Sequence, residues 1–258
     1  MTSTDSALIQ ASRLSKRYED GVLALDGLDL EVQAGEIYGM LGGNGAGKTT
    51  AIHLFLNFIE PTSGEARIAG FSSHREPLEA KKHVAFVSEN VSLYPNFTAV
   101  QNLEYFTRLG GRNNLTRKDY EAVLQRVGLD REAHDKRLRG FSKGMRQKCG
   151  LAIAILKDAP AILLDEPTSG LDPKAGLEFM RLLEALREEG KAILMSTHDL
   201  FRAKELVDRL GIMNRGVLMA ELGRDELRHE DLESVYVSYM SGYMDGEAGA
   251  AVAGRRAG

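Results

Sequence analysis

The chain has 258 residues, of which 43% are hydrophobic and 27% charged, and its net charge at neutral pH is −4. This length and hydrophobic content suit one large domain, or one domain with a subdomain, built on a substantial core. The acidic balance argues against a nucleic-acid partner, no apolar run reaches the ~20 residues of a membrane-spanning helix, and the first residues lack the pattern of a signal peptide. The single cysteine, Cys149, excludes an internal disulfide and suits a reducing cytosol.

Short alternating segments open the chain. Residues 7–11, 23–25 and 28–32 alternate apolar and polar side chains, and glycine-containing pairs such as Asp26-Gly27 separate them. This pattern predicts an antiparallel β-layer with tight turns between its strands.

A glycine-rich stretch follows an apolar run at residues 37–41. Its nine residues are Gly42, Gly43, Asn44, Gly45, Ala46, Gly47, Lys48, Thr49 and Thr50. The run predicts a buried parallel strand and the residues from Ala51 onward predict a helix, so the stretch is a loop between the two. Its spacing fits G-x-x-x-x-G-K-[ST], in which backbone N–H groups and the helix N-terminus bind phosphate. We expect Lys48 to reach the β- and γ-phosphates and Thr49 to ligate Mg²⁺.

Two more strands and a helical stretch follow this phosphate loop. Residues 66–70 predict a short strand and residues 84–87 a fuller one, with Glu89 just after it. Polar groups at such a strand end are where ligands meet an α/β sheet. From residue 94 to residue 156 the pattern is helical and includes a capping box that begins at Thr98. We therefore expect a small helical module inserted into an α/β core.

Two carboxylates end the next apolar strand. Residues 161–164 are all apolar, as in a strand buried on both faces, and Asp165 and Glu166 follow directly. In phosphate-loop enzymes an Asp at this place holds Mg²⁺, and an adjacent carboxylate can act as a general base. Residues 192–197 predict another buried strand, which ends at His198. A lone histidine after a strand is usually a hydrogen-bonded loop residue, but this strand should join the sheet that carries the phosphate loop.

Taken in order, these motifs resemble the nucleotide-binding subunit of an ATP-binding cassette (ABC) transporter, over about residues 5–225. The matching positions are the phosphate loop, Asp165 and Glu166 of the second nucleotide motif, Ser142 and Gly144 of the signature sequence, Asp172 of the D-loop, the switch histidine His198, and Tyr18 as the aromatic that stacks on adenine. Each motif alone is modestly specific, and the six in this order and spacing are highly specific.

The sequence departs from the common family pattern at two places. Glu89 stands where the family usually has the glutamine of its Q-loop, and Lys143 and Met145 replace common residues of the signature. Both variants resemble a subset of the family whose permease is a separate chain and which is mostly associated with export. We expect Glu89 to lie near the metal through water and to matter more for coupling than for nucleotide binding.

The resemblance implies a fold and its division. We expect an α/β phosphate-loop NTPase core with a parallel sheet, an N-terminal antiparallel β-layer and an inserted α-helical subdomain. The core takes residues 1–90 and 158–240, and the subdomain with the signature takes residues 91–157. Residues 241–258 are rich in glycine and alanine and predict a disordered tail.

The resemblance also implies a mechanism and partners. Two copies would face head to tail, with each ATP between Lys48 of one copy and the signature of the other. Glu166 would activate the attacking water, His198 would hold the γ-phosphate, and Mg²⁺ would be kept in place by Thr49, Asp165 and Glu89. Such a subunit is cytoplasmic and peripheral to the inner face of the membrane, where it binds a transmembrane permease.

Other functional classes share part of this pattern. A soluble switch ATPase of the same fold, which does not act in transport, would use every nucleotide residue named above. A translation factor of this kind normally carries two cassettes in one chain, whereas this chain has one set of motifs. A small-molecule kinase would share the phosphate loop but has no use for Ser142, Gly144 or Asp172.

Overall fold

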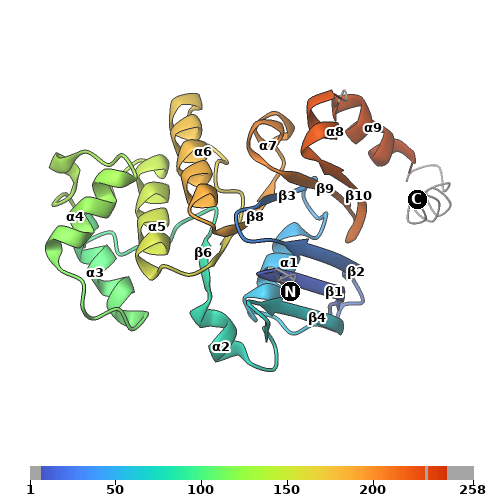
Figure 1. The fold of residues 1–258 in the computed structure, drawn as a ribbon, viewed down its shortest axis with the longest axis horizontal. Helices are drawn as coiled ribbons and strands as arrows, with labels where there is room; N and C mark the ends of the chain where they lie inside the picture. The colour runs from blue at the N-terminus through green and yellow to red at the C-terminus, as the bar shows by residue number, and fades with distance from the viewer. Residues whose placement is uncertain (1–6, 230–231, 243–258) are drawn as a thin grey trace, which may run out of the picture.

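The structure is a computed structural model that describes residues 7–229 and 232–242 (Figure 1). Its strands are β1 (Ile9–Arg17), β2 (Leu23–Val32), β3 (Ile37–Leu41), β4 (Ser63–Ile68), β5 (Phe71–Ser72), β6 (Val84–Val87), β7 (Ala161–Leu164), β8 (Ala192–Thr197), β9 (Arg209–Asn214) and β10 (Val217–Gly223). Its α-helices are α1 (Lys48–Phe55), α2 (Pro77–Lys82), α3 (Ala99–Leu109), α4 (Arg117–Arg126), α5 (Lys143–Lys157), α6 (Pro173–Glu188), α7 (Leu200–Leu206), α8 (Arg224–His229) and α9 (Leu232–Gly242).

The N-terminal strands form the predicted antiparallel layer, in the order β2-β1-β4-β5. One part of the prediction was wrong, because the segments at 23–25 and 28–32 are a single strand, β2. The expected turn at Gly27 is instead an irregularity within that strand. Gly27 has a φ of +61° and its N–H donates to the Ser15 hydroxyl at 2.9 Å, so the strand bends locally without ending.

The second sheet has the order β10-β9-β3-β8-β7-β6. Its strands β9, β3, β8, β7 and β6 run parallel, and β10 pairs antiparallel with β9. Successive residues of β8 are buried on opposite faces: Leu194 packs with α1 and the antiparallel layer, whereas Ile193 and Met195 pack with α6 and α7. This layered arrangement confirms the predicted α/β core with its antiparallel β-layer.

Helices α3, α4 and α5 lie together at one end of the molecule and share a hydrophobic cluster of their own (Figure 1). Leu103, Leu124 and Cys149 are fully buried in it. The predicted capping box at the start of α3 is present, since the Thr98 and Gln101 side chains each accept a hydrogen bond from the other residue's N–H. The division of the chain at residues 91–157 stays a prediction.

The C-terminal helix α9 ends at Gly242. The predicted disordered tail, 241–258, therefore overlaps this helix by two residues, and the rest of it lies outside the described residues. Within 7–229 and 232–242, no helix combines the length and the apolar character that crossing a membrane requires.

Candidate functional site

Four neighbouring parallel strands end at the same edge of the second sheet. Leu41 at the end of β3 pairs with Thr197 of β8, while Leu164 at the end of β7 pairs with Met195 of β8 and with Val87 of β6. The loops that follow these strands are the phosphate loop and the segments that carry His198, Asp165-Glu166 and Glu89. Ligands of parallel α/β sheets bind at this carboxyl edge.

The phosphate loop, residues 42–50, needs glycine for steric reasons at two positions. A Cβ on Gly42 would lie 2.5 Å from the Met213 carbonyl oxygen, and a Cβ on Gly47, whose φ is +100°, would lie 2.6 Å from the Ala24 carbonyl oxygen. The loop borders a cavity of about 220 Å³. The residues that line it are Gly43, Asn44, Gly45, Ala46, Gly47, Lys48, Thr49, Thr50, Glu89, Asp165 and Glu166.

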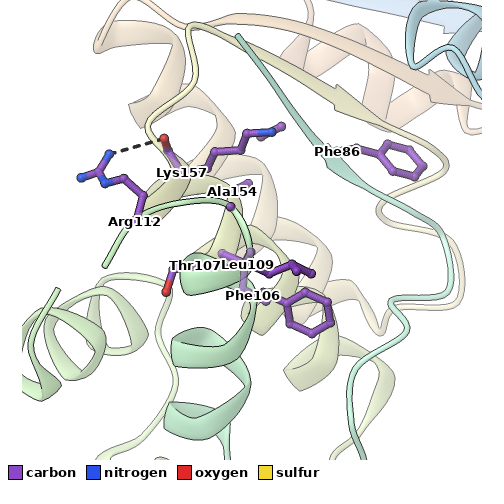
Figure 2. Close-up of a pocket in the computed structure, with 10 residues that line it drawn as sticks. Phe86, Phe106, Thr107, Leu109, Arg112, Ala154 and Lys157 are labelled. Atoms are coloured by element: carbon purple, nitrogen blue, oxygen red, sulfur yellow. Dashed lines mark hydrogen bonds between the residues drawn. The ribbon is translucent and has the colours of Figure 1, made fainter. Parts of the chain in front are cut away.

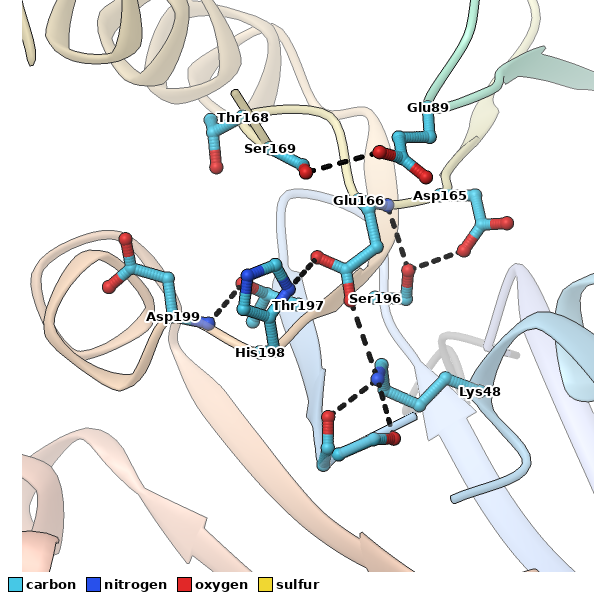
Figure 3. Close-up of polar contacts among 12 residues, drawn as sticks. Lys48, Glu89, Asp165, Glu166, Thr168, Ser169, Ser196, Thr197, His198 and Asp199 are labelled. Carbon is cyan, nitrogen blue, oxygen red and sulfur yellow. Dashed lines mark hydrogen bonds and ion pairs between the residues drawn. The ribbon is translucent and has the colours of Figure 1, made fainter. Parts of the chain in front are cut away.

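Lys48 is the first residue of α1 and its side chain is buried. Its ammonium donates to the carbonyl oxygens of Gly42 at 2.6 Å and Gly43 at 3.2 Å, and it lies 3.4 Å from the Glu166 carboxylate (Figure 3). A cation held at the N-terminus of a helix, beside a loop of backbone N–H groups, forms a site for an anion. A phosphate in this cavity would compete with Glu166 for the Lys48 charge.

Asp165 connects the phosphate loop to strand β8. Its Oδ1 accepts hydrogen bonds from the Thr49 hydroxyl at 3.1 Å and from the Ser196 hydroxyl at 2.6 Å (Figure 3 shows the Ser196 contact). The Ser196 oxygen also accepts a hydrogen bond from the Glu166 N–H at 2.9 Å. Sequence reasoning missed Ser196, although a hydroxyl near the end of a fully buried strand was a signal that could have found it.

Glu166 lies between two basic groups. Its Oε2 is 2.7 Å from the His198 Nδ1, and its Oε1 faces the Lys48 ammonium (Figure 3). The residue has a φ of +47°, which is uncommon for a residue with a side chain and often found at functional sites. The structure thus brings His198, Glu166 and Lys48 into one contiguous chain of polar contacts.

Glu89 also lines this cavity. Its carboxylate contacts the Ser169 hydroxyl and the Lys143 ammonium, two partners that the sequence alone did not identify (Figure 3 shows the Ser169 contact). The signal for Lys143 was present, since a cation in the signature accompanies an unusual carboxylate in the Q-loop.

The signature turn, residues 142–145, contributes no residue to the described lining of this cavity. Ser142 caps α5 by accepting a hydrogen bond from the Met145 N–H at 3.2 Å, and Asp172 caps α6 by accepting one from the Ala175 N–H at 2.9 Å. A Cβ on Gly144 would lie 3.5 Å from the Ala175 Cβ, so the two helix starts pack together. Within the described part of this one chain, Ser142, Gly144 and Asp172 are not among the residues that line the cavity.

Tyr18 follows β1 in the hairpin that leads to β2. Its N–H donates to the Val22 carbonyl at 2.9 Å, and the Lys16 ammonium lies 5.4 Å from the centre of its ring. The ring is 38% exposed and does not line the described cavity. Its role in binding a base stays a prediction.

Comparisons with known proteins agree with this geometry. Residues 25–169 match the ABC transporter family. The ABC transporter ATP-binding protein NatA of Bacillus subtilis (strain 168) is 35% identical over 240 residues, which are 90% of this chain and 97% of NatA. The bacitracin transport ATP-binding protein BcrA of Bacillus licheniformis is 38% identical over 86% of this chain and 72% of its own length.

A solved structure of an ATP-binding cassette has the same fold as this chain. It is the dimeric structure of an ATP-binding cassette in a post-hydrolysis state with bound ADP and Pi. The two chains superpose with a TM-score of 0.77 at 27% identity, over 84% of this chain and 98% of that one. The family match, the fold and the convergence of Lys48, Asp165 and Glu166 on one cavity agree. This chain therefore belongs to the ABC transporter family and is an ATP-binding and ATP-hydrolysing cassette.

Proposed function

We propose that this chain is the ATPase subunit of an exporter whose transmembrane permease is a separate chain. The observation that carries the proposal is the convergence of four strand-end loops on one cavity, where Lys48 contacts Glu166 and Thr49 donates a hydrogen bond to Asp165. The relative whose name states bacitracin transport supports a transport role. The absence of any candidate membrane span among the described residues agrees with a separate permease.

The nucleotide phosphates would lie in the 220 Å³ cavity. The N–H groups of the phosphate loop and the start of α1 would bind the phosphate oxygens, and Lys48 would turn from Glu166 towards the β- and γ-phosphates. Replacing the two loop carbonyls and one carboxylate around Lys48 by phosphate oxygens keeps its buried charge paired. This exchange would also release the Glu166 carboxylate.

Glu166 would then act as the general base. Its carboxylate orients a water molecule in line with the γ-phosphorus and accepts the proton as the water oxygen attacks, while ADP leaves. His198, which contacts Glu166 at 2.7 Å, would hold the γ-phosphate and so fix the position of the base. Moving the Lys48 ammonium from its resting contacts onto the transferred phosphate would stabilise the negative charge that develops there.

The donor set at this edge fits Mg²⁺. Thr49 and Asp165 offer hard oxygen ligands that already lie 3.1 Å apart, and Glu89 lines the same cavity. When bound, Mg²⁺ supplies Lewis-acid stabilisation of the phosphate oxygens. Thr49 and Asp165 would hold the ion, and Glu89 would approach it through water. Ser196 holds Asp165 in place by its hydrogen bond at 2.6 Å.

A second copy of the chain would complete the site. Ser142 and Gly144 begin a helix whose N-terminus suits an anion, yet they lie outside the cavity of their own chain. Two copies arranged head to tail would place this helix start against the γ-phosphate bound by the other copy, with Asp172 beside it. The dimeric cassette structure with ADP and Pi supports the association of two copies. Tyr18 would stack on the adenine.

The permease would contact the helical module. Figure 2 shows a second cavity, of about 280 Å³, between β6, α3 and α5, with Phe86 and Phe106 among the side chains around it. Leu109 at its rim is 72% exposed, and Tyr105 nearby on α3 is exposed as well. An apolar hollow rimmed by polar groups is typical of a protein-binding site. Contact here would hold the chain at the inner face of the membrane.

Co-purification and ATPase measurements test this proposal together. We expect a multi-pass membrane protein to co-purify with the chain and to stimulate its hydrolysis of ATP. Leu109→Ser should abolish the stimulation and leave the hydrolysis of the isolated chain unchanged. Leu78→Ser is the matched control, because Leu78 is equally exposed at 76% but lies on α2. If no membrane protein binds and hydrolysis is unaffected by any membrane fraction, the chain is a switch ATPase without a transport role.

A further inference from the structure

The Glu89 carboxylate is held by two groups from separate parts of the chain. Its Oε1 lies 3.3 Å from the Lys143 ammonium, at the start of α5, and accepts a hydrogen bond from the Ser169 hydroxyl at 3.1 Å (Figure 3 shows the latter). A Cβ on Gly170 would lie 3.5 Å from the Lys143 nitrogen, so the ammonium also touches the segment after β7. Three loops therefore meet at this one carboxylate.

The backbone of the Glu89 loop is held from the same helix. The Gln147 side-chain amide donates to the carbonyl oxygens of Ser88 at 3.2 Å and Glu89 at 2.7 Å. Gln147 follows Lys143 by four residues, so the two side chains lie on one face of α5. Gln147 is buried, which fixes the position of its amide. Helix α5 thus fixes the main chain of Glu89 through one side chain and its carboxylate through another.

The charges around the cavity show why Glu89 needs a cation. Three carboxylates line the cavity, those of Glu89, Asp165 and Glu166. Lys48 and His198 contact Glu166, and Asp165 accepts hydrogen bonds from two neutral hydroxyls. An ATP-binding cavity receives a polyanion, and an extra carboxylate beside it weakens binding by Coulomb repulsion. Lys143 is the cation that contacts Glu89 in the described part of the chain.

The position of Lys143 is itself unfavourable without this partner. It is the first residue of α5, where the helix carries its partial positive charge, and the first turn contains no acidic residue. A cation at a helix N-terminus is destabilising unless an anion lies close to it. Glu89, from a loop 54 residues earlier in the chain, is that anion.

We propose that Lys143 is a positioning residue for the ATPase reaction, which neutralises Glu89 and holds its carboxylate at the edge of the nucleotide cavity. The two departures from the common ABC sequence are then one paired change, a carboxylate in the Q-loop matched by a cation in the signature. This inference rests on the proposed role of Glu89 near the bound nucleotide. It adds that Lys143 acts on the nucleotide of its own chain through Glu89.

A carbodiimide cross-link tests the pair itself, without reference to activity. The reagent activates the Glu89 carboxylate, the Lys143 amine attacks the activated carbon, and an amide forms as the urea leaves. We expect mass spectrometry of the nucleotide-free chain to find this amide. Lys143→Arg, which keeps the charge but lacks the primary amine, is the negative control. If the parent chain yields no Glu89–Lys143 amide while other lysine–carboxylate contacts such as Lys148–Glu178 cross-link, the pair does not form and the inference is overturned.

A double-variant cycle tests the consequence of the pair. The measured quantity is the dissociation constant for a non-hydrolysable ATP analogue with Mg²⁺. We expect Lys143→Gln to weaken binding by about fivefold, the upper end for a partly exposed ion pair, and Lys143→Arg to restore it to within about twofold. In a Glu89→Gln background there is no charge to neutralise, so Lys143→Gln should change affinity by less than about twofold.

The outcomes separate this inference from the proposed function. An equal loss of affinity from Lys143→Gln in both backgrounds would mean that Lys143 acts on the nucleotide without Glu89, and would overturn the pairing. Unchanged affinity in every variant, with normal hydrolysis by the parent, would overturn the positioning role and leave the ATPase assignment intact. A parent chain that neither binds nor hydrolyses ATP would contradict the proposed function, whereas the cross-link would still report on the pair.

Discussion

The phosphate-loop edge, which is the carboxyl edge of the second sheet, and the signature turn at residues 142–145 differ in how many of their polar groups already meet within one chain. At the edge, Lys48, Asp165 and Glu166 already contact one another or their neighbours from adjacent strands, at distances between 2.6 and 3.4 Å. In the signature turn, the Ser142 side chain bonds only within its own helix, as a cap. Both regions are well-formed starts of helices, α1 and α5, but only the first borders the cavity.

Under the proposed function, this difference would separate the parts of the reaction that one chain can perform from those that need a second. Binding the phosphates and orienting water would use groups that four adjacent strands bring together. The signature turn is a helix start of the kind that binds anions, but within residues 7–229 and 232–242 none of its residues lines the phosphate-loop cavity. Under the proposed function, a site divided in this way would be assembled only when two copies meet, and their association would depend on ATP.

The variant with the largest expected effect changes a residue at the phosphate-loop edge. Glu166→Gln removes the base while keeping the shape of the side chain, so we expect hydrolysis to fall by about 10²–10⁴-fold. ATP binding should survive, since the phosphate loop is untouched. Steady-state phosphate release and equilibrium ATP binding measure the two effects. Glu188→Gln, on the exposed end of α6, is the control and should retain the parent rate. Hydrolysis by Glu166→Gln at the parent rate would refute the role of this residue.

We expect a smaller effect on function from Tyr18, which would bind the adenine base rather than the phosphates. Stacking of a base on an aromatic ring contributes roughly 1–3 kcal/mol, so Tyr18→Ala should weaken ATP affinity by about tenfold or more. The rate of hydrolysis at saturating ATP should change little. Tyr105→Ala is a matched control, because Tyr105 is 39% exposed, close to the 38% of Tyr18, and lies on α3. Equal ATP affinity in the parent and Tyr18→Ala would return Tyr18 to a loop aromatic that packs against Lys16.

Sequence patterns predicted the core of the fold because its signals are local. The strands at residues 37–41, 84–87, 161–164 and 192–197 are short apolar runs that stand out from their flanks, and the structure places them at those bounds. The loop glycines and the capping box at Thr98 are likewise local features. The mistake in β2 has a local cause as well, since a bulge at Gly27 and a turn share the same residue preferences.

Contacts between distant segments could not be predicted in the same way. Ser196 bonds to Asp165, 31 residues away, and Lys143 pairs with Glu89, 54 residues away. No spacing rule links such positions, because their proximity depends on the strand order of the sheet and on the packing of α5 against the core. Each was visible only as an unusual polar residue in a motif or at a strand end.

The division of the site between two copies is most directly tested by the mass of the Glu166→Gln chain in solution. Size exclusion with light scattering, in ATP and Mg²⁺, should find a dimer that reverts to a monomer when nucleotide is removed. Adding Ser142→Arg should keep this variant monomeric by blocking the signature turn. Adding Thr98→Arg, which replaces the cap of α3 instead, should leave the dimer intact and so control for the loss of a helix cap. A Glu166→Gln chain that stays monomeric in saturating ATP, or that dimerises equally well with Ser142→Arg, would contradict a site shared between two chains.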